Sequence, residues 1–509
     1  MKLKYIFVSC LSFLAVSCND SFLERLPQDQ LADESYWSEG EDAVKYTTSL
    51  YCYLVQPGNH MVMLDAYTDN AVPVHVGAEQ GEISAGAATA NNPHFAQVWA
   101  DAYNGIRRCN IFMENIDRVQ MNEQERSVLI GEVEFLRAYY HATLLKFYGG
   151  IPILTKHLDL NEPIPARNTE EEVYDFIVKE CDKAIAKLPL KAAEVGRATK
   201  GAALALKAHI AYLNHKYDVA AKAAKEIIDL GVYSLYPDYA GLFAKANENN
   251  CEVIFDHQFM DNGVDPFNTG SWIDQFFAPV DFGGWEALSP SQDLVDAYEC
   301  TDGKSIAESA LYDENKPFEN RDPRLAASIL WHGSKFGPIT FDASNMGDGN
   351  HTRTGYTMRK CIDETNYGCN YWGALNYILF RYAETLLVYA ESINELNGPT
   401  AEVYDAVNQV RARVNLPGLA EGLSKDQMRE AIRHERRVEF PFEGIHLFET
   451  RSWKTTESCV TKPVYGRNTK GEKVLVEKRK FNPEKDYLWG IPQTEIDLSK
   501  GVLKNNPGY

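Results

Sequence analysis

The sequence predicts a mainly α-helical protein, with a scaffold of tetratricopeptide-like helix pairs, a long irregular, loop-rich segment and a few short strands. Three observations predict this fold class. Apolar side chains recur at helical spacing through most of residues 92–230 and again through residues 376–440. Small residues line two successive helices in residues 199–230. Residues 232–375 instead combine strand-like pieces with stretches rich in Gly, Asn, Asp, Pro and aromatic residues.

The first 17 residues, 1–17, predict a signal peptide. Lys2 and Lys4 form a basic start, and the mostly apolar run that follows is shorter than the about 20 residues that span a bilayer. The next residues are similar to a lipobox, although Ala15 stands where Leu is commonest. In that interpretation Cys18 becomes the lipid-modified start of the mature chain. The alternative is a soluble secreted protein in which this Cys is incidental.

The charge of the chain argues against nucleic acid as a partner. The sequence contains 51 basic and 72 acidic residues, for a net charge of −21. A field of that sign repels phosphate backbones and anionic membrane surfaces. The aromatic content of 12% is high for so acidic a chain and excludes a disordered one.

The expected helices follow a polar tether at 19–30. Helical patterns cover residues 42–53, 94–119, 122–148, 169–188, 199–230, 376–397, 401–415 and 425–440. The helix at 122–148 is apolar on nearly every side, with one polar stripe formed by Glu134, Arg137 and His141. Gly149 can close it in the left-handed conformation. Such a helix belongs at the centre of a large helical core.

Residues 199–230 give the clearest repeat-like unit. One helix is lined by Ala202, Ala205, Ala208 and Tyr212, and the next by Tyr217, Ala220, Ala224 and Ile227. Small residues at this spacing let two helices approach closely, as in a tetratricopeptide hairpin. Any Ala-rich antiparallel hairpin fits this unit equally well, but the further pair at 376–397 and 401–415 favours the repeat.

The mature chain, 18–509, divides into three parts. An N-terminal helical part at 18–231 and a C-terminal helical part at 376–509 flank the loop-rich residues 232–375. Loops this long inside a compact protein are usually functional or disordered. Because the aromatic residues argue against disorder, we place the ligand-binding surface in 232–375.

Charged residues interrupt the apolar faces of the C-terminal helices. They are Arg381, Glu384 and Glu391 in the first helix, and Glu435, Arg436, Arg437, Glu439 and Glu443 further on. Buried charges are costly unless they are paired, so we expect Arg–Glu networks that join these helices. A catalytic role for these residues is the alternative.

Motifs for catalysis and for cofactors are missing from the sequence. There is no HExxH, GxSxG, P-loop or strand-linked GxGxxG. We therefore expect no enzyme activity and no cofactor, although a carboxylate pair for glycoside cleavage leaves no sequence signature. The candidates for such a pair are acidic residues of the irregular segment, namely Asp261, Asp265, Asp274, Asp281 and Glu286.

One segment is similar to the start of a calcium loop. It begins at Asp342 and continues to Asp348. Met346 stands at the fifth ligand position and Arg353 replaces the bidentate Glu at the twelfth. No metal site is therefore expected.

The aromatic residues of the irregular segment are the expected ligand contacts. They are Trp272, Trp285, Trp331, Tyr371 and Trp372. A flat aromatic face suits the C–H face of a sugar ring, and nearby polar side chains can bind the hydroxyl groups. For these polar contacts the candidates are Asp69, Asn91 and Asn92, which lie in an earlier irregular segment at 57–95 that is rich in Gly, Asn and Pro. For each ring the alternative is burial beneath its own loop, which is the role expected in the core for Trp37, Trp99, Trp453 and Trp489.

Several motifs in fixed order make the chain similar to the SusD/RagB family of outer-membrane nutrient-binding lipoproteins. They are SFLERLPQDQ at 21–30, VWADAYNGIRRCN at 98–110, EFLRAYYHATLLKFYGGIPIL at 134–154, RDPRL at 321–325, FRYAETLLVYAESINELNG at 380–398, NQVRARVNLPGL at 408–419, HERRVEFPFEG at 434–444, LWGIPQTEI at 488–496 and NNPGY at 505–509. The chain departs from the family pattern after PFEG, where it continues IHLFETRSW.

The resemblance implies a cell-surface protein of the outer membrane, held by a lipid anchor. Such a protein binds a glycan on an irregular face above a SusC-like TonB-dependent transporter and delivers it for uptake without cutting it. Ligand residues vary within the family, so the resemblance transfers none of them. Three alternatives stay open: a peptide ligand in the same role, a glycoside hydrolase on a helical scaffold, and a scaffold that binds only another protein.

Overall fold

Nine long helices form most of the scaffold in the residues that the computed structural model describes, which are 37–54, 61–159, 162–261, 269–369 and 373–509. These helices are α3 (Gly40–Leu50), α6 (Pro93–Asn115), α7 (Glu123–Tyr148), α8 (Glu170–Lys187), α9 (Lys200–Leu213), α10 (Tyr217–Leu230), α15 (Tyr382–Asn397), α16 (Ala401–Arg413) and α17 (Lys425–Glu439). The mainly helical fold class predicted from the sequence is confirmed.

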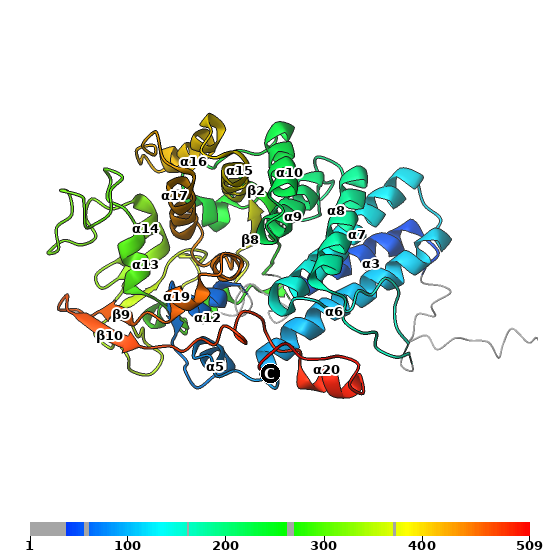
Figure 1. The fold of residues 1–509 in the computed structure, drawn as a ribbon, viewed down its shortest axis with the longest axis horizontal. Helices are drawn as coiled ribbons and strands as arrows, with labels where there is room; N and C mark the ends of the chain where they lie inside the picture. Colours follow the sequence, from blue (N-terminus) through cyan, green and yellow to red (C-terminus); the bar gives the residue numbers. More distant parts are fainter. Residues whose placement is uncertain (1–36, 55–60, 160–161, 262–268, 370–372) are drawn as a thin grey trace, which may run out of the picture.

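The long helices make one continuous array (Figure 1). Neighbours in the chain pack together from α6 to α10. α10 then packs against α15, which contacts α16 and α17. The residues between α10 and α15 therefore leave the array and return to it, so the loop-rich segment is an excursion from a helical scaffold.

Shorter helices and turns lie mainly outside this array. The short α-helices are α5 (Glu79–Ser84), α12 (Ile273–Phe277), α13 (Gln292–Ala297), α14 (Pro323–Ser328), α18 (His446–Ser452), α19 (Thr456–Val460) and α20 (Gln493–Leu498). The 3-10 turns are η2 (Tyr51–Tyr53), η3 (Val62–Tyr67), η4 (Ile116–Arg118), η5 (Gly241–Phe243), η6 (Lys245–Asn247) and η7 (Val280–Phe282).

The strands form small antiparallel pairs. The pairs are β1 (Ala71–Pro73) with β3 (Leu288–Pro290), β2 (Val253–His257) with β8 (Tyr377–Arg381), β4 (Ile329–Trp331) with β7 (Tyr356–Met358), β5 (Lys335–Phe336) with β6 (Ile339–Thr340), and β9 (Val464–Arg467) with β10 (Lys473–Glu477).

Local sequence signals explain the ends of the central helices. The Asn122 side chain accepts hydrogen bonds from the backbone N–H groups of Gln124 and Glu125 and so caps the start of α7. The helix ends at Gly149, whose φ of 72° is a conformation that glycine adopts without steric cost. A capping box between Thr169 and Glu172 starts α8. These ends agree with the boundaries predicted from the sequence.

The polar stripe of α7 is buried against α8. Arg137 Nη2 lies 2.6 Å from Glu180 Oε2, and Lys187 Nζ lies 2.7 Å from Glu134 Oε2. His141 Nδ1 contacts the Arg137 carbonyl oxygen at 2.8 Å. Burial lowers the pKa of His141 to about 4, so its imidazole is neutral near pH 7. The polar stripe therefore joins α7 to α8 through buried ion pairs.

The prediction that residues 376–397 form a single helix is wrong at its start. Residues Tyr377–Arg381 form strand β8, and the helix begins only at Tyr382. The Tyr382 backbone N–H donates to the Glu252 carbonyl oxygen at 2.9 Å, beside the β2–β8 ladder. Pairing with a strand that lies more than a hundred residues earlier overrides the local helical spacing.

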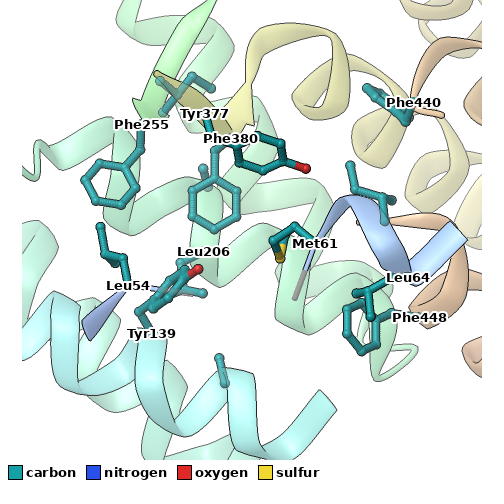
Figure 2. Packing of buried hydrophobic residues seen from close by; sticks show 14 of the residues in the cluster. Leu54, Met61, Leu64, Tyr139, Leu206, Phe255, Tyr377, Phe380, Phe440 and Phe448 are labelled. Carbon is teal, nitrogen blue, oxygen red and sulfur yellow. The ribbon is translucent and has the colours of Figure 1, made fainter. Parts of the chain in front are cut away.

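This strand pair joins the loop-rich segment to the helical core (Figure 2). Phe255 of β2 packs edge-on against Phe135 of α7, with ring centroids 5.0 Å apart. Phe380 of β8 stacks on Phe255 at 6.5 Å. Tyr377 is buried and donates from its hydroxyl to the Phe442 carbonyl oxygen at 3.0 Å. The β2–β8 pair thus anchors the loop-rich segment to the helical core.

The expected Arg–Glu network is confirmed around α17. Arg381 pairs with Glu439 at 2.6 Å and with Glu443 at 2.7 Å. Arg324 of α14 reaches both Glu435 and Glu439. Burial raises the pKa of Glu439, but the surrounding guanidinium groups outweigh burial and hold it well below its usual range. The network therefore ties α14 and β8 to α17 and serves the fold.

Candidate functional site

Trp331, one of the predicted ligand residues, ends strand β4 and forms part of an aromatic stack. Its ring lies parallel to that of Phe318, with centroids 4.2 Å apart and an angle of 11° between the planes. Its partner across the β4–β7 ladder is Tyr356, whose ring is edge-on to Phe318 at 6.3 Å. Trp331 is half-buried, so one side is supported by the stack while part of the indole stays accessible.

The stack lies in a cleft of about 480 Å³, which we call the Trp331 cleft. This volume is within the roughly 300–1,000 Å³ that ligand sites commonly occupy. The lining residues are Glu314, Asn315, Pro317, Phe318, Trp331, His332, Gly355, Tyr356, Arg467, Asn468, Thr469, Lys470 and Gly471. One wall thus comes from the loop-rich segment and the other from the β9–β10 hairpin, far away in the sequence.

Two glycines allow the hairpin to lie directly against the loop-rich segment. A Cβ atom on Gly355 would lie 2.0 Å from the Arg467 carbonyl oxygen, and one on Gly466 would lie 2.3 Å from the Thr354 carbonyl oxygen. The Arg467 backbone N–H donates to the Thr354 carbonyl oxygen at 2.7 Å. This close backbone contact fixes the two walls of the Trp331 cleft relative to each other.

The chemistry of the Trp331 cleft suits a polyhydroxylated ligand. Trp331 offers a flat apolar face, which suits the C–H face of a sugar ring. Around it, Asn315 and Thr469 supply amide and hydroxyl groups that can donate to and accept from ligand hydroxyls. His332 is paired with Asp342 at 3.1 Å on the rim. A flat ring with polar groups at its margin is the arrangement expected of a carbohydrate subsite.

Trp272 and Trp285 form a second aromatic group, apart from the Trp331 cleft. The Trp285 ring is edge-on to Phe276 at 5.0 Å, and the Trp272 ring lies 6.0 Å from Phe276. Both tryptophans are half-buried. Trp272 precedes α12 with a φ of 60°, an uncommon value for a bulky residue. Neither lines the Trp331 cleft, so the structure does not gather the predicted rings into one site.

Two carboxyl groups near this second group bind backbone N–H groups of neighbouring loops. Asp274 Oδ1 accepts from the Asp363 N–H at 2.9 Å. Glu286 accepts from Thr352 at 3.1 Å and from Val280 at 3.3 Å. Burial raises the pKa of Asp274 to about 6 and that of Glu286 to about 8. Their oxygens thus serve to connect loops, which is a structural use of the acidic residues considered for glycoside cleavage.

The polar residues predicted as hydrogen-bonding contacts have structural partners or lie apart from the Trp331 cleft. Asp69 is buried between Arg437 and His446, at 3.0 and 2.9 Å. Burial raises the pKa of Asp69, but these two partners outweigh it and hold the pKa well below its usual range. Asn92 caps α6 and is 2% exposed. Asn91 is exposed in the turn before α6. We therefore leave Asp69 and Asn92 out of the proposed surface.

The remaining predicted residues lie outside the described part of the chain. Tyr371 and Trp372 fall in 370–372, and Cys18 falls in 1–36. Their proposed roles stay predictions. Within the described ranges, no helix combines the length and apolarity needed to cross a membrane. Within the same ranges, no three His, Cys, Asp or Glu side chains are grouped to hold a metal ion.

The sequence did not predict that Phe318, Tyr356 and the β9–β10 hairpin contribute to the candidate site. A signal for the hairpin exists, because alternating residues at 464–467 and 473–477 flank an NTKG turn at 468–471. Nothing local predicts that this hairpin reaches the loop-rich segment. The C-terminal part, expected to be helical scaffold, therefore contributes a wall of the candidate site.

An array of helix pairs that carries an aromatic cleft defines a helical-repeat protein with a candidate ligand site. Two family matches place it more closely. Residues 251–509 match the SusD family, and residues 21–213 match a family described as starch-binding and associating with the outer membrane. The chain belongs to the SusD family.

Solved structures agree with this assignment. A SusD-like protein from Bacteroides fragilis is 32% identical, with a TM-score of 0.85 over 95% of this chain and 100% of the other. A SusD-like carbohydrate-binding protein from the same species is 28% identical, with a TM-score of 0.84 over 92% and 99% of the two chains. Surface glycan-binding protein A from Bacteroides thetaiotaomicron, solved with laminarihexaose, is 21% identical over 92% and 99%, with a TM-score of 0.72. The last likeness concerns the fold alone.

Proposed function

We propose that this protein is an outer-membrane lipoprotein, anchored through Cys18, that binds an oligosaccharide at the cell surface. In this proposal it passes the glycan to a SusC-like TonB-dependent transporter for uptake. Membership of the SusD family supports the proposal, as does the description of the matching N-terminal family as associating with the outer membrane. The lipobox-like sequence before Cys18 supports the anchor.

The observation that carries the binding role is the stack of Trp331 on Phe318 inside the Trp331 cleft. A supported indole loses little conformational freedom when a sugar ring packs on it. The amide group of Asn315 and the hydroxyl group of Thr469 would then bind the sugar hydroxyls. A relative with 28% identity is described as a carbohydrate-binding protein, which supports a glycan as the ligand.

Binding without catalysis is part of the proposal. The carboxyl groups of Asp274 and Glu286 are engaged with backbone N–H groups, as described above, and the Trp331 cleft has Glu314 as its only carboxylate among the described lining residues. Glycoside cleavage commonly uses two carboxyl groups on either side of the scissile bond. Purified protein incubated with each glycan it binds should therefore release no reducing ends.

Trp331→Ala tests the binding role. Loss of the stacking face should weaken glycan binding at least about tenfold in calorimetry, which corresponds to about 1.4 kcal/mol. Trp453→Ala is the matched control, because Trp453 is also half-buried but contacts Arg433 and Tyr212 in the helical scaffold. That variant should keep its affinity even if its thermal stability falls. Equal glycan affinity in wild type and Trp331→Ala would contradict the proposal.

The same variants separate a glycan from a peptide ligand. A peptide would be held mainly by backbone hydrogen bonds and apolar pockets, so its binding would respond weakly to Trp331→Ala. A screen of mixed peptides and glycans against both variants decides between them. Peptide binding that is insensitive to Trp331, with no glycan bound, would replace the proposed ligand class.

A further inference from the structure

The charged residues of the Trp331 cleft have the opposite balance to the whole chain. The sequence has 72 acidic and 51 basic residues. Among the lining residues, however, Arg467 and Lys470 face a single carboxylate, Glu314. His332 adds a further cationic group when protonated, although Asp342 pairs with it at 3.1 Å. A locally basic cleft on an acidic protein attracts ligands that carry negative charge.

The β9–β10 hairpin fixes the Arg467 side chain and orders the turn that carries Lys470. Arg467 Nε donates to the Gly471 carbonyl oxygen at 2.8 Å, so its side chain is fixed within the turn. The Asn468 side chain accepts the backbone N–H groups of Lys470 and Glu472, each at 3.0 Å, and this orders the tip of the hairpin. Arg467 also lies near the Tyr356 hydroxyl, since its charge opposes the rise in the pKa of Tyr356 that burial causes.

Several cations near the Trp331 cleft are paired with carboxylates. Lys316 pairs with Glu319, and Arg353 pairs with Glu477. Arg359 likewise pairs with Glu364 at 2.8 Å. In the described part of the chain, neither Arg467 nor Lys470 forms an ion pair. In a protein with 21 more acidic than basic residues, cations without a partner at the mouth of a cleft are available to a ligand.

We propose that the glycan bound in the Trp331 cleft is acidic, and that Arg467 and Lys470 bind its carboxylate or sulfate groups. This inference rests on the proposed function and names its substrate class. The two Nη groups of Arg467 point to bidentate recognition of a planar carboxylate or a sulfate ester, because a guanidinium presents two parallel N–H donors. Lys470 adds a second charge-assisted bond from the tip of the hairpin. Trp331 supplies the stacking surface for the ring that carries, or neighbours, the charged group.

The experiment begins with a panel of acidic and neutral plant, algal and host polysaccharides. We then select every glycan that binds the wild-type protein but not Trp331→Ala. Binding of each selected glycan is compared with binding of its own neutral derivative, by calorimetry in 50 and 300 mM NaCl. Carboxyl reduction and desulfation provide these derivatives and distinguish uronic acids from sulfate esters. We expect an acidic glycan to bind, its neutral derivative to bind at least about tenfold more weakly, and added salt to weaken only the acidic one.

Lys470→Gln tests the role of the hairpin. Lys470 is exposed at the turn, so this variant should fold normally. It should weaken binding of the acidic glycan about 3- to 10-fold, reduce the salt dependence, and leave binding of any neutral glycan unchanged. Lys478→Gln is the matched control, since Lys478 is exposed beyond β10 and does not line the Trp331 cleft.

The possible outcomes separate this inference from the proposed function. If only neutral glycans bind in a Trp331-dependent manner, or if Lys470→Gln and Lys478→Gln bind the acidic glycan equally well, the charge inference is overturned while glycan binding stands. If no member of the panel binds, the proposed function fails, and the charge inference fails with it.

Discussion

Replacement of Arg381 tests how much the buried Arg–Glu network contributes to the stability of the fold. The Arg381 side chain is 1% exposed and its five N–H donors are all engaged. Nε and Nη2 each donate to the Glu443 carboxylate at 2.7 Å. Nη1 donates to the Glu252 carboxylate at 2.8 Å and to the Glu439 carboxylate at 2.6 Å. Nη2 also donates to the Glu439 carbonyl oxygen. Arg381→Met keeps most of the side-chain volume, so the expected loss comes from charge and not from a cavity.

The structure sets the size of the effect. In Arg381→Met, Glu443 keeps Lys360, whereas Glu252 and Glu439 keep Arg413. Each carboxylate therefore loses part of its compensation while staying buried. Removing one partner of a buried ion pair costs about 3–5 kcal/mol, out of a typical 5–15 kcal/mol for a folded protein. We expect a loss of about 3–5 kcal/mol in the free energy of unfolding.

Guanidinium unfolding followed by far-ultraviolet circular dichroism measures this loss. Lys225→Met is the control, because Lys225 forms an exposed helical pair with Asp229 and should cost less than about 1 kcal/mol. Adding Glu443→Gln to Arg381→Met should restore part of the stability, since one poorly compensated carboxylate is removed. If Arg381→Met costs no more than Lys225→Met, the network does not hold the loop-rich segment to α17 as described.

Two further predictions concern the loop-rich segment. Burial raises the pKa of Glu286 to about 8. The folded state therefore keeps a proton on Glu286 that the unfolded state loses from about pH 4 upward. As a result, the free energy of unfolding should fall as pH rises from about 5 to 8. Glu286→Gln should flatten that part of the profile in urea unfolding, and parallel profiles would show that Glu286 is not the responsible group. Because Trp272 and Trp285 lie apart from the Trp331 cleft, Trp272→Ala and Trp285→Ala should each weaken glycan binding less than Trp331→Ala does, in calorimetry and without loss of helicity. Unchanged affinity in both would place this aromatic group outside the ligand surface.

The helical scaffold could be predicted because its signals are local. The helix that ends at Gly149 is read from an unbroken apolar pattern, a capping Asn and a glycine stop. The pair formed by α9 and α10 is read from small residues at regular offsets. Strand β8 could not be predicted in the same way, because its partner β2 lies far away in the sequence and the apolar spacing of 377–381 also fits a helix.

The candidate site could be predicted only in part, for a related reason. Trp331 was identified as an aromatic residue in an irregular segment, and the structure places it in a cleft. The opposite wall comes from residues 467–471, and only tertiary contact brings it there. The prediction for Asp69 illustrates the same limit. A polar residue in an irregular segment is expected to be exposed, but Asp69 is buried between Arg437 and His446. Sequence indicated the chemistry of the ligand surface but not its assembly.

A structure of the protein with a bound oligosaccharide would show where the ligand lies. We predict a sugar ring packed against the Trp331 indole, with a charged substituent within hydrogen-bonding distance of Arg467 or Lys470. An oligosaccharide bound elsewhere, for instance in the groove of about 680 Å³ that Ala326, Ala327 and Thr365 help to line, would contradict this prediction.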